Sequence, residues 1–227
     1  LIQFIVWFYL LRASPQRQCR LLVFPCLSLR LFLKRRPHTF YFMNRIYFDN
    51  AATTALDKEV LDAMLPYLTT RFGKPSSIYS YGRESRLAIE SYRKTVAKLL
   101  NAHPGEIFFT SGGTESNNTA VLSAIRDLGC KHIISSPIEH HAILHTVEHY
   151  SSSGEVSHSY VKLFSNGHVD LQDLEEQLAA HTERCLVSLM HANNEIGNIL
   201  DIDAVGSICK KYNAIFHSDC VQTVGHY

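Results

Sequence analysis

Polar side chains follow several apolar segments of this 227-residue sequence, at positions where a strand would end. Asp219 and Gln222 come after the apolar run AIFHS, and Asn194 comes after CLVSLM. A carboxylate behind such a run is part-buried and needs a cationic partner, for which a protonated pyridine nitrogen would serve. Amide side chains both donate and accept hydrogen bonds, so Asn194 and its neighbours could bind a phenolate oxygen or a carboxylate.

A pair of glycines stands between the apolar segment IFFT and an amphipathic segment that begins near Thr114. Gly112 and Gly113 would let the backbone approach an anion closely, and the N–H groups at the start of the next helix would point at that anion. The alternative is a tight turn capped by Thr114, with no ligand. The pattern is neither GxGxxG nor a Walker loop, so a nucleotide is not the expected ligand.

Four histidines lie in the segment EHHAILHTVEHY, namely His140, His141, His145 and His149. The last three share one face of a helix and could hold a metal ion. No HExxH motif accompanies them and no fourth ligand is near, so we expect a polar helix face and no metal site. His140 differs from the others because it falls at the junction of a strand and a helix, on the side of a parallel sheet where ligands bind.

The elements that must position these residues alternate along the chain after Met43. Apolar runs such as CLVSLM predict parallel strands covered on both faces, and amphipathic stretches between them predict helices. We therefore predict an α/β fold with a mostly parallel sheet and helices on both faces. The predicted strands cover 46–49, 106–110, 131–135, 158–163, 185–190 and 214–218, and the predicted helices cover 57–70, 82–100, 115–128, 140–150, 170–179 and 203–212.

Residues 1–42 differ in kind from residues 43–227. They hold seven of the 22 basic residues and none of the 21 acidic ones, so the remainder carries a net charge of −6. A secretory signal would place its charges before the apolar stretch, a membrane span needs about 20 apolar residues, and a transit peptide is richer in serine. We interpret 1–42 as a non-native upstream or leader segment that is disordered, and 43–227 as the folded domain.

The cysteine distribution and the net charge indicate which cellular compartment and which partners to expect. The four cysteines after Met43 (Cys130, Cys185, Cys209 and Cys220) are scattered and form no CxxC pair. This distribution is typical of buried thiols in a reducing compartment, so we expect a cytoplasmic protein. The overall net charge of +1 singles out no charged partner, and we expect neither a nucleic acid nor a membrane.

Six motifs follow one another across residues 46–225: IYFDNAATT, FGKPSSIYSYGR, FFTSGGTESNN, EHHAI, MHANNEIG and HSDCVQTVG. In this order and spacing they resemble the N-terminal half of the NifS/IscS-type cysteine desulfurases, which are class V aminotransferases among the fold-type I pyridoxal-phosphate (PLP) enzymes. The resemblance implies that 43–227 is part of the large, PLP-binding domain of such an enzyme and that this domain is incomplete at its C-terminus.

The resemblance also implies a role for each polar residue at the predicted strand ends. Asp219 would pair with the pyridinium nitrogen and keep the ring cationic, and His140 would stack on the ring, which makes these two the candidate catalytic residues. The candidate cofactor-binding residues are Gly113 and Thr114 at the phosphate, His140 and Asp219 at the ring, Asn194 beside the cofactor and the substrate carboxylate, and Gln222 at the phenolic oxygen.

Three positions depart from the family pattern. Lys74 and Tyr79 stand where the family usually has Asn and His in GNPSSIH, which puts fine details of that loop in doubt. Cys220 stands where a small Ala is commoner, and it does not match the family's persulfide cysteine, which lies far downstream.

The resemblance implies a homodimeric parent enzyme that converts L-cysteine to L-alanine and passes sulfur, through an enzyme persulfide, to an acceptor or scaffold protein for iron–sulfur cluster or thio-cofactor assembly. Its Schiff-base lysine and persulfide cysteine would lie beyond Tyr227, so we expect the chain as printed to be inactive. A selenocysteine lyase or another class V aminotransferase is the nearest alternative. A non-catalytic dimerising or scaffold-docking module is the alternative from another class.

Overall fold

The computed structural model describes residues 5–7 and 46–226, and the chain divides into one unit of residues 1–9 and 55–227 and another of residues 10–54. In the second unit, residues 50–52 form a turn in which the N–H groups of Ala52 and Thr53 donate to the Asp49 carbonyl oxygen. The strand predicted at 46–49 is wrong, because this segment is irregular and has no partner strand within the described residues.

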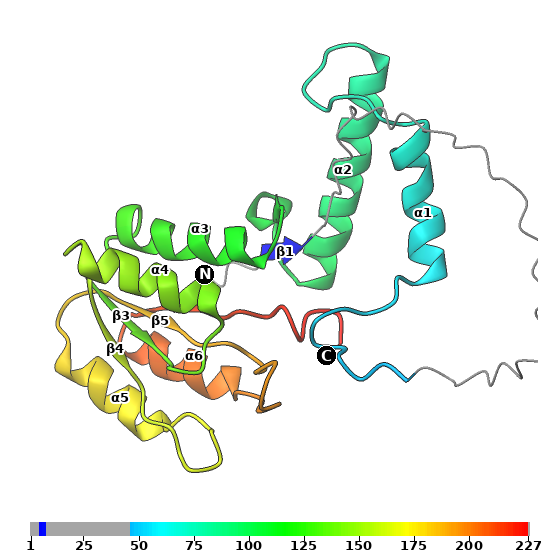
Figure 1. Cartoon of the computed structure of the whole chain (residues 1–227). Helices are drawn as coiled ribbons and strands as arrows, with labels where there is room; N and C mark the ends of the chain where they lie inside the picture. Colours follow the sequence, from blue (N-terminus) through cyan, green and yellow to red (C-terminus); the bar gives the residue numbers. More distant parts are fainter. Residues whose placement is uncertain (1–4, 8–45, 227) are drawn as a thin grey trace, which may run out of the picture. The chain divides into compact units, whose positions relative to one another are not determined.

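The larger unit contains a four-stranded parallel sheet with the strand order β4-β3-β5-β6 (Figure 1). Parallel neighbours need a crossover connection, and a helix follows each of the first three strands of this sheet along the chain. The strands of this sheet confirm four of the six predicted ones within a few residues, and a fifth, predicted at 106–110, is confirmed by β2 (Phe108–Thr110). The four in this sheet are β3 (His132–Ser135), β4 (Ser157–Tyr160), β5 (Cys185–Ser188) and β6 (Ile215–His217).

Two pairs of helices cover the two faces of this sheet. Helices α3 (Gly113–Arg126) and α4 (His141–Ser152) pack on one face with Ile133 and Leu186. Helices α5 (Leu171–Ala180) and α6 (Ile202–Lys211) pack on the other face with Ile134 and Val187 (Figure 1). Because neighbouring strand residues point to opposite faces, the central strands β3 and β5 are buried at all four positions, whereas the outer strand β4 (Ser157–Tyr160) is polar and only partly buried. This arrangement confirms the predicted α/β class.

The remaining elements precede this sheet in the chain. They are α1 (Lys58–Thr69), α2 (Ser80–Leu99), a 3-10 turn at Pro104–Glu106 and β2 (Phe108–Thr110), which leads into α3. Strand β1 (Ile5–Trp7) pairs in parallel with β2. It lies within the segment predicted to be a disordered leader, and the rest of 1–42 lies outside the described residues, so the origin of that segment stays a prediction. No helix of the described part is long and apolar enough to cross a membrane.

Buried cysteines lie in the core on both faces of the sheet. Cys130 lies in the core under α3 and α4, whereas Cys185 and Cys209 lie in the core under α5 and α6. All three are free thiols. Burial raises the pKa of Cys130, raises that of Cys185 to about 11 and raises that of Cys209 to about 12. These cysteines are therefore inert packing residues in the folded protein.

A buried histidine begins β3. The ring nitrogens of His132 lie 2.7 Å from the Ser157 hydroxyl and 2.9 Å from the Ser159 hydroxyl, and the ring stacks on His181 at 3.8 Å. Burial lowers the pKa of His132 to about 4, and the positive charge that His181 and His158 can carry adds to this effect. His132 is thus a neutral core residue at physiological pH.

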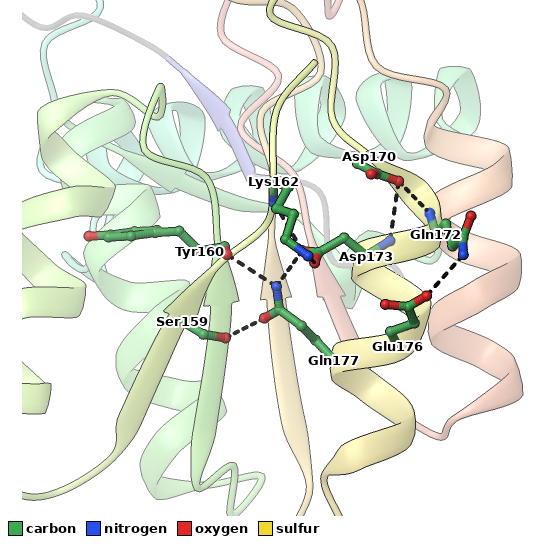
Figure 2. Close-up of polar contacts among 8 residues, drawn as sticks. All are labelled: Ser159, Tyr160, Lys162, Asp170, Gln172, Asp173, Glu176 and Gln177. Atoms are coloured by element: carbon green, nitrogen blue, oxygen red, sulfur yellow. Dashed lines mark hydrogen bonds and ion pairs between the residues drawn. The ribbon is translucent and has the colours of Figure 1, made fainter. Parts of the chain in front are cut away.

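A polar network joins the outer strand β4 to α5 (Figure 2). The Asp173 carboxylate accepts hydrogen bonds from the Lys162 backbone N–H at 2.9 Å and from Gln177 at 2.6 Å, and it lies 2.7 Å from the Lys162 ammonium group. Gln177 also donates to the Tyr160 carbonyl oxygen and accepts from the Ser159 hydroxyl. Burial acts to raise the pKa of Asp173, but the hydrogen bonds from Lys162 and Gln177 outweigh it and lower this pKa.

Candidate functional site

The polar residues singled out in the sequence gather where β3, β5 and β6 end. The three strands are paired in parallel, so their carboxyl ends meet at one edge of the sheet. The Ser135 hydroxyl donates to the Ser188 carbonyl oxygen across this edge at 3.1 Å. The segments 136–140, 189–201 and 218–224 continue from these strand ends and carry the candidate residues.

Asp219 is a buried carboxylate at the end of β6, only 8% exposed. Its Oδ2 accepts from Asn117 Nδ2 at 2.7 Å, and its Oδ1 accepts from the Val221 backbone N–H at 2.9 Å. Within the described residues it forms no ion pair. A buried carboxylate without a cation is costly, so this position is suited to a positively charged ligand atom.

Asn117 connects Asp219 to the glycine turn, and sequence reasoning missed it. It is buried in α3, four residues after Gly113, and residues at this spacing share one face of a helix. This four-residue spacing from Gly113 was the signal in the sequence that could have identified Asn117. The face of α3 that carries Gly113 therefore points to the strand ends, and Asn117 fixes the orientation of the Asp219 carboxylate.

The start of α3 has the features of an anion site. The helix begins at Gly113, two residues earlier than predicted, and no side chain of the described part caps it. Thr114 therefore lies inside the first turn, which contradicts the alternative of a turn capped by Thr114. The Glu115 carboxylate accepts from the backbone N–H and the hydroxyl of Ser111 instead. The uncapped N–H groups at Gly113 and Thr114 favour a phosphate group.

His140 lies exposed at the N-cap of α4, where its Nδ1 accepts a hydrogen bond from the Ala142 backbone N–H at 3.1 Å. This bond fixes the ring at the edge of the site. His141 and His145 are also exposed, and their rings stack at 5.3 Å. The described residues contain no group of His, Cys, Asp and Glu side chains that could hold a metal ion.

The two neighbouring asparagines after β5 point in different directions. Asn193 is buried, donates to the Ile138 carbonyl oxygen at 2.7 Å, and accepts from the backbone N–H groups of Glu195 and Ile196. Asn194 is exposed. Asn194 is therefore the more accessible of the two, and its role at a ligand stays a prediction, whereas Asn193 holds the loop in shape.

The loops after β5 and β6 are tied together by hydrogen bonds. The His191 backbone N–H donates to the Asp219 carbonyl oxygen at 2.9 Å, and His191 Nδ1 lies 2.9 Å from the hydroxyl of buried Thr223. Gln222, the predicted partner of a phenolic oxygen, lies half-buried next to Thr223. These bonds attach the segment that contains Asp219 and Gln222 to the loop after β5.

This arrangement fits PLP. A buried carboxylate without a cation suits a pyridinium nitrogen, an uncapped helix start suits a phosphate, and an exposed imidazole at the edge suits ring stacking. The structure brings Asn117 of α3 into contact with Asp219. It places His140, Asn194 and Gln222 in three loops that leave the same edge of the sheet.

Residues 46–227 match the family described as aminotransferase class-V. Relatives include a cysteine desulfurase IscS from Dictyoglomus turgidum, 48% identical over 80% of this chain and 46% of its own length. A mitochondrial cysteine desulfurase from Drosophila melanogaster is 44% identical over 79% of this chain and 39% of its own length.

Solved structures agree with these sequence relatives. A NifS-like protein has a TM-score of 0.72 and 40% identity over 79% of this chain and 50% of its own length. SspA in complex with cysteine has a TM-score of 0.71 and 32% identity over 78% of this chain and 51% of its own length. The chain thus spans about half the length of the relatives it matches. The chain belongs to the aminotransferase class-V family, and within it the chain is similar to IscS- and NifS-like cysteine desulfurases.

Proposed function

We propose that the protein of which this chain is a part is a PLP-dependent cysteine desulfurase that converts L-cysteine to L-alanine. The observation that carries the proposal is Asp219, a buried carboxylate held by Asn117 and Val221 with no cation beside it in the described part of the chain. When bound, PLP supplies a cationic ring that withdraws electrons and stabilises negative charge at the substrate Cα. Asp219 keeps the ring nitrogen protonated, because a nearby carboxylate raises the pKa of that nitrogen.

The other residues of the site bind and orient. The backbone N–H groups of Gly113 and Thr114 hold the phosphate, and the His140 ring packs on the cofactor ring. Gln222 hydrogen-bonds the phenolic oxygen. Asn194 contacts the cofactor and orients the substrate carboxylate. L-cysteine is the proposed substrate because the IscS-like relatives are cysteine desulfurases and SspA was solved with cysteine.

The rest of the proposed reaction uses residues beyond those described. A downstream lysine attaches the cofactor, and a downstream cysteine takes the sulfur as a persulfide and passes it to an acceptor or scaffold protein. Lys210 and Lys211 are poor substitutes for that lysine, because both are exposed at the end of α6 and Lys211 lies 2.6 Å from Glu175. We further propose a homodimer located in the cytoplasm.

The proposal is tested by replacing Asp219 in the protein that carries this chain. Asp219→Ala should lower the rate of alanine and sulfide formation from L-cysteine by at least about 100-fold, because it removes an electrostatic partner of the reacting system. Gln222→Ala removes one hydrogen bond, worth about 0.5–1.5 kcal/mol, and should cost about 2- to 10-fold. Exposed Gln172→Ala serves as the matched control and should change nothing. Equal, mild losses from Asp219→Ala and Gln222→Ala would contradict the role of Asp219.

Residues 1–227 alone give a second measurement. We expect weak, non-covalent PLP binding, no sulfide release and, after borohydride reduction, no phosphopyridoxyl adduct by mass spectrometry. A stoichiometric adduct on one lysine together with sulfide release would show that the chemistry lies elsewhere in the chain.

A further inference from the structure

Glu139 is a buried acid that the proposed reaction does not use. It precedes His140 in the loop between β3 and α4, and it is only 6% exposed. Its Oε1 accepts a hydrogen bond from the Met190 backbone N–H at 2.8 Å, in the segment that leaves β5. Its Oε2 is buried and has no hydrogen-bond partner in the described part of the chain. A fully buried acid with one satisfied oxygen calls for an explanation.

A second hydrogen bond joins the same two loops. The side chain of Asn193 donates to the carbonyl oxygen of Ile138, the residue before Glu139. Glu139 and Asn193 thus each reach into the other loop, Glu139 from the loop before α4 and Asn193 from the loop after β5. His140 follows Glu139 directly, and Asn194 follows Asn193 directly.

We propose that Glu139 is a positioning residue that clamps the loop before α4 to the loop after β5 and thereby fixes His140 and Asn194 for ligand binding. The consequence for PLP rests on the proposed function, whereas the clamp itself does not. Among the side-chain hydrogen bonds given for the described residues, loss of the clamp would leave the one from Asn193 to join the two loops, so both ligand-facing residues should become more mobile.

The charge state of Glu139 supports this role. Burial raises the pKa of Glu139 to about 8, the Asp219 carboxylate adds to the rise, and the Met190 N–H opposes it. The other titratable side chains near Glu139 are those of His140, which is next in the chain, and His168, which lines one pocket together with Glu139. Glu139 is therefore a neutral acid at pH 7, which spares Asp219 a second negative charge beside it.

A group whose pKa is higher in the folded than in the unfolded protein stabilises the fold at low pH. The stability that protonated Glu139 contributes is fully present below the unfolded pKa of about 4.3 and is lost as the pH rises to about 8. Glu139→Gln keeps an oxygen acceptor for the Met190 N–H and cannot ionise. It should therefore keep the clamp and remove this loss.

The test compares wild type, Glu139→Gln, Glu139→Ala and the exposed control Glu176→Gln in the 227-residue chain. Between pH 5.5 and 8.5 the Tm of wild type should fall by about 4 °C or more relative to that of Glu139→Gln. At pH 7, hydrogen exchange in peptides covering 136–140 and 190–198 should speed up about tenfold or more in Glu139→Ala and stay unchanged in Glu139→Gln. The dissociation constant for PLP should rise about tenfold in Glu139→Ala only.

The outcomes separate this proposal from the proposed function. Parallel pH profiles of Tm for wild type and Glu139→Gln, or unchanged exchange in both loops of Glu139→Ala, would overturn the clamp. Failure of Glu139→Gln to fold would also overturn it, because a neutral acceptor should suffice. If Glu139→Ala does not fold, the pH profile of Glu139→Gln decides. Absence of PLP binding in all four proteins would count against the proposed function alone, and the stability and exchange results would still decide the clamp.

Discussion

A buried aspartate lies beside the end of each outer strand of the four-stranded sheet, and the two aspartates are satisfied in different ways. Asp173, beside the end of β4, is 7% exposed, and Asp219, after β6, is 8% exposed. Asp173 contacts an ammonium group from Lys162 and accepts from Gln177 (Figure 2). Asp219 accepts from Asn117 and Val221 and has no cation beside it in the described residues.

Burial of a carboxylate costs about the same free energy in both places, so the difference lies in what offsets that cost. At β4 the chain itself supplies the cation and the hydrogen bonds, and the result is a structural clasp between a strand and a helix. At β6 the described residues supply only hydrogen bonds, and under the proposed function the ligand supplies the charge. The proposal therefore separates a stabilising acid from a ligand-binding one by whether the chain itself supplies a cation.

The largest stability effect should come from the Asp173 side. Asp173→Ala leaves the Lys162 backbone N–H and the Gln177 amide without their acceptor, so the free energy of unfolding should fall by about 2–4 kcal/mol. Urea unfolding measures this loss. Exposed Glu176→Ala, one turn along on α5, should cost less than about 0.5 kcal/mol. A loss for Asp173→Ala no larger than that of the control would erase the difference between the two aspartates.

The two asparagines after β5 sharpen the same comparison on a smaller scale. Asn193→Ala removes a side chain that donates to Ile138 and accepts from two backbone N–H groups, so unfolding should become easier by about 2 kcal/mol. Asn194→Ala should leave stability within about 0.5 kcal/mol and weaken PLP binding instead. Thermal unfolding and PLP titration of both variants check this. Reversed effects would mean that the structure assigns the inward and outward side chains wrongly.

A pH-dependent effect is expected at the other end of β3. The pKa of His132 is about 4 in the folded protein, below the value of about 6.5 for a free histidine. Its contribution to stability is therefore full above pH 6.5 and is lost as the pH falls toward 4. Between about pH 6.5 and 4 the free energy of unfolding should therefore fall less steeply in His132→Gln than in wild type, and Tm measured across this range checks it.

The matched control for this acid effect is His141→Gln, because His141 is exposed on α4. Its Tm profile should follow that of wild type. His217 is a second contributor, because burial lowers its pKa to about 4 as well, so the single variant should remove only part of the acid sensitivity. Identical profiles for wild type and His132→Gln would show that the His132 ring is not shielded from water.

Sequence patterns predicted most of the fold. Period and apolar content located the strands of the sheet and the helices within a few residues, most clearly the central strands β3 and β5, which are buried on both faces. The segment 46–49 failed, because its apolar pattern suits a strand but a strand also needs a neighbour. Asp219 and Asn194 were singled out as candidates because polar residues after an apolar strand stand out, and the structure places them in the loops after β6 and β5.

The partners of these residues could not be found in the same way. Asn117 and Asp219 are 102 residues apart, and Glu139 and Met190 are 51 apart, so only the folded chain brings them together. Local patterns also could not tell which of Asn193 and Asn194 points inward. That choice depends on the carbonyl oxygen of Ile138, which reaches the loop from another strand end.

The buried thiols provide a way to measure how often the core opens. Cys130 lies under α3 and α4 and Cys209 under α5 and α6, and a thiol with a raised pKa reacts with an alkylating reagent only after the surrounding packing opens. Peptide mapping would distinguish these two sites from the other cysteines. Their alkylation rates would therefore report, separately and without an engineered cysteine, how often the packing of each helical layer on the sheet opens.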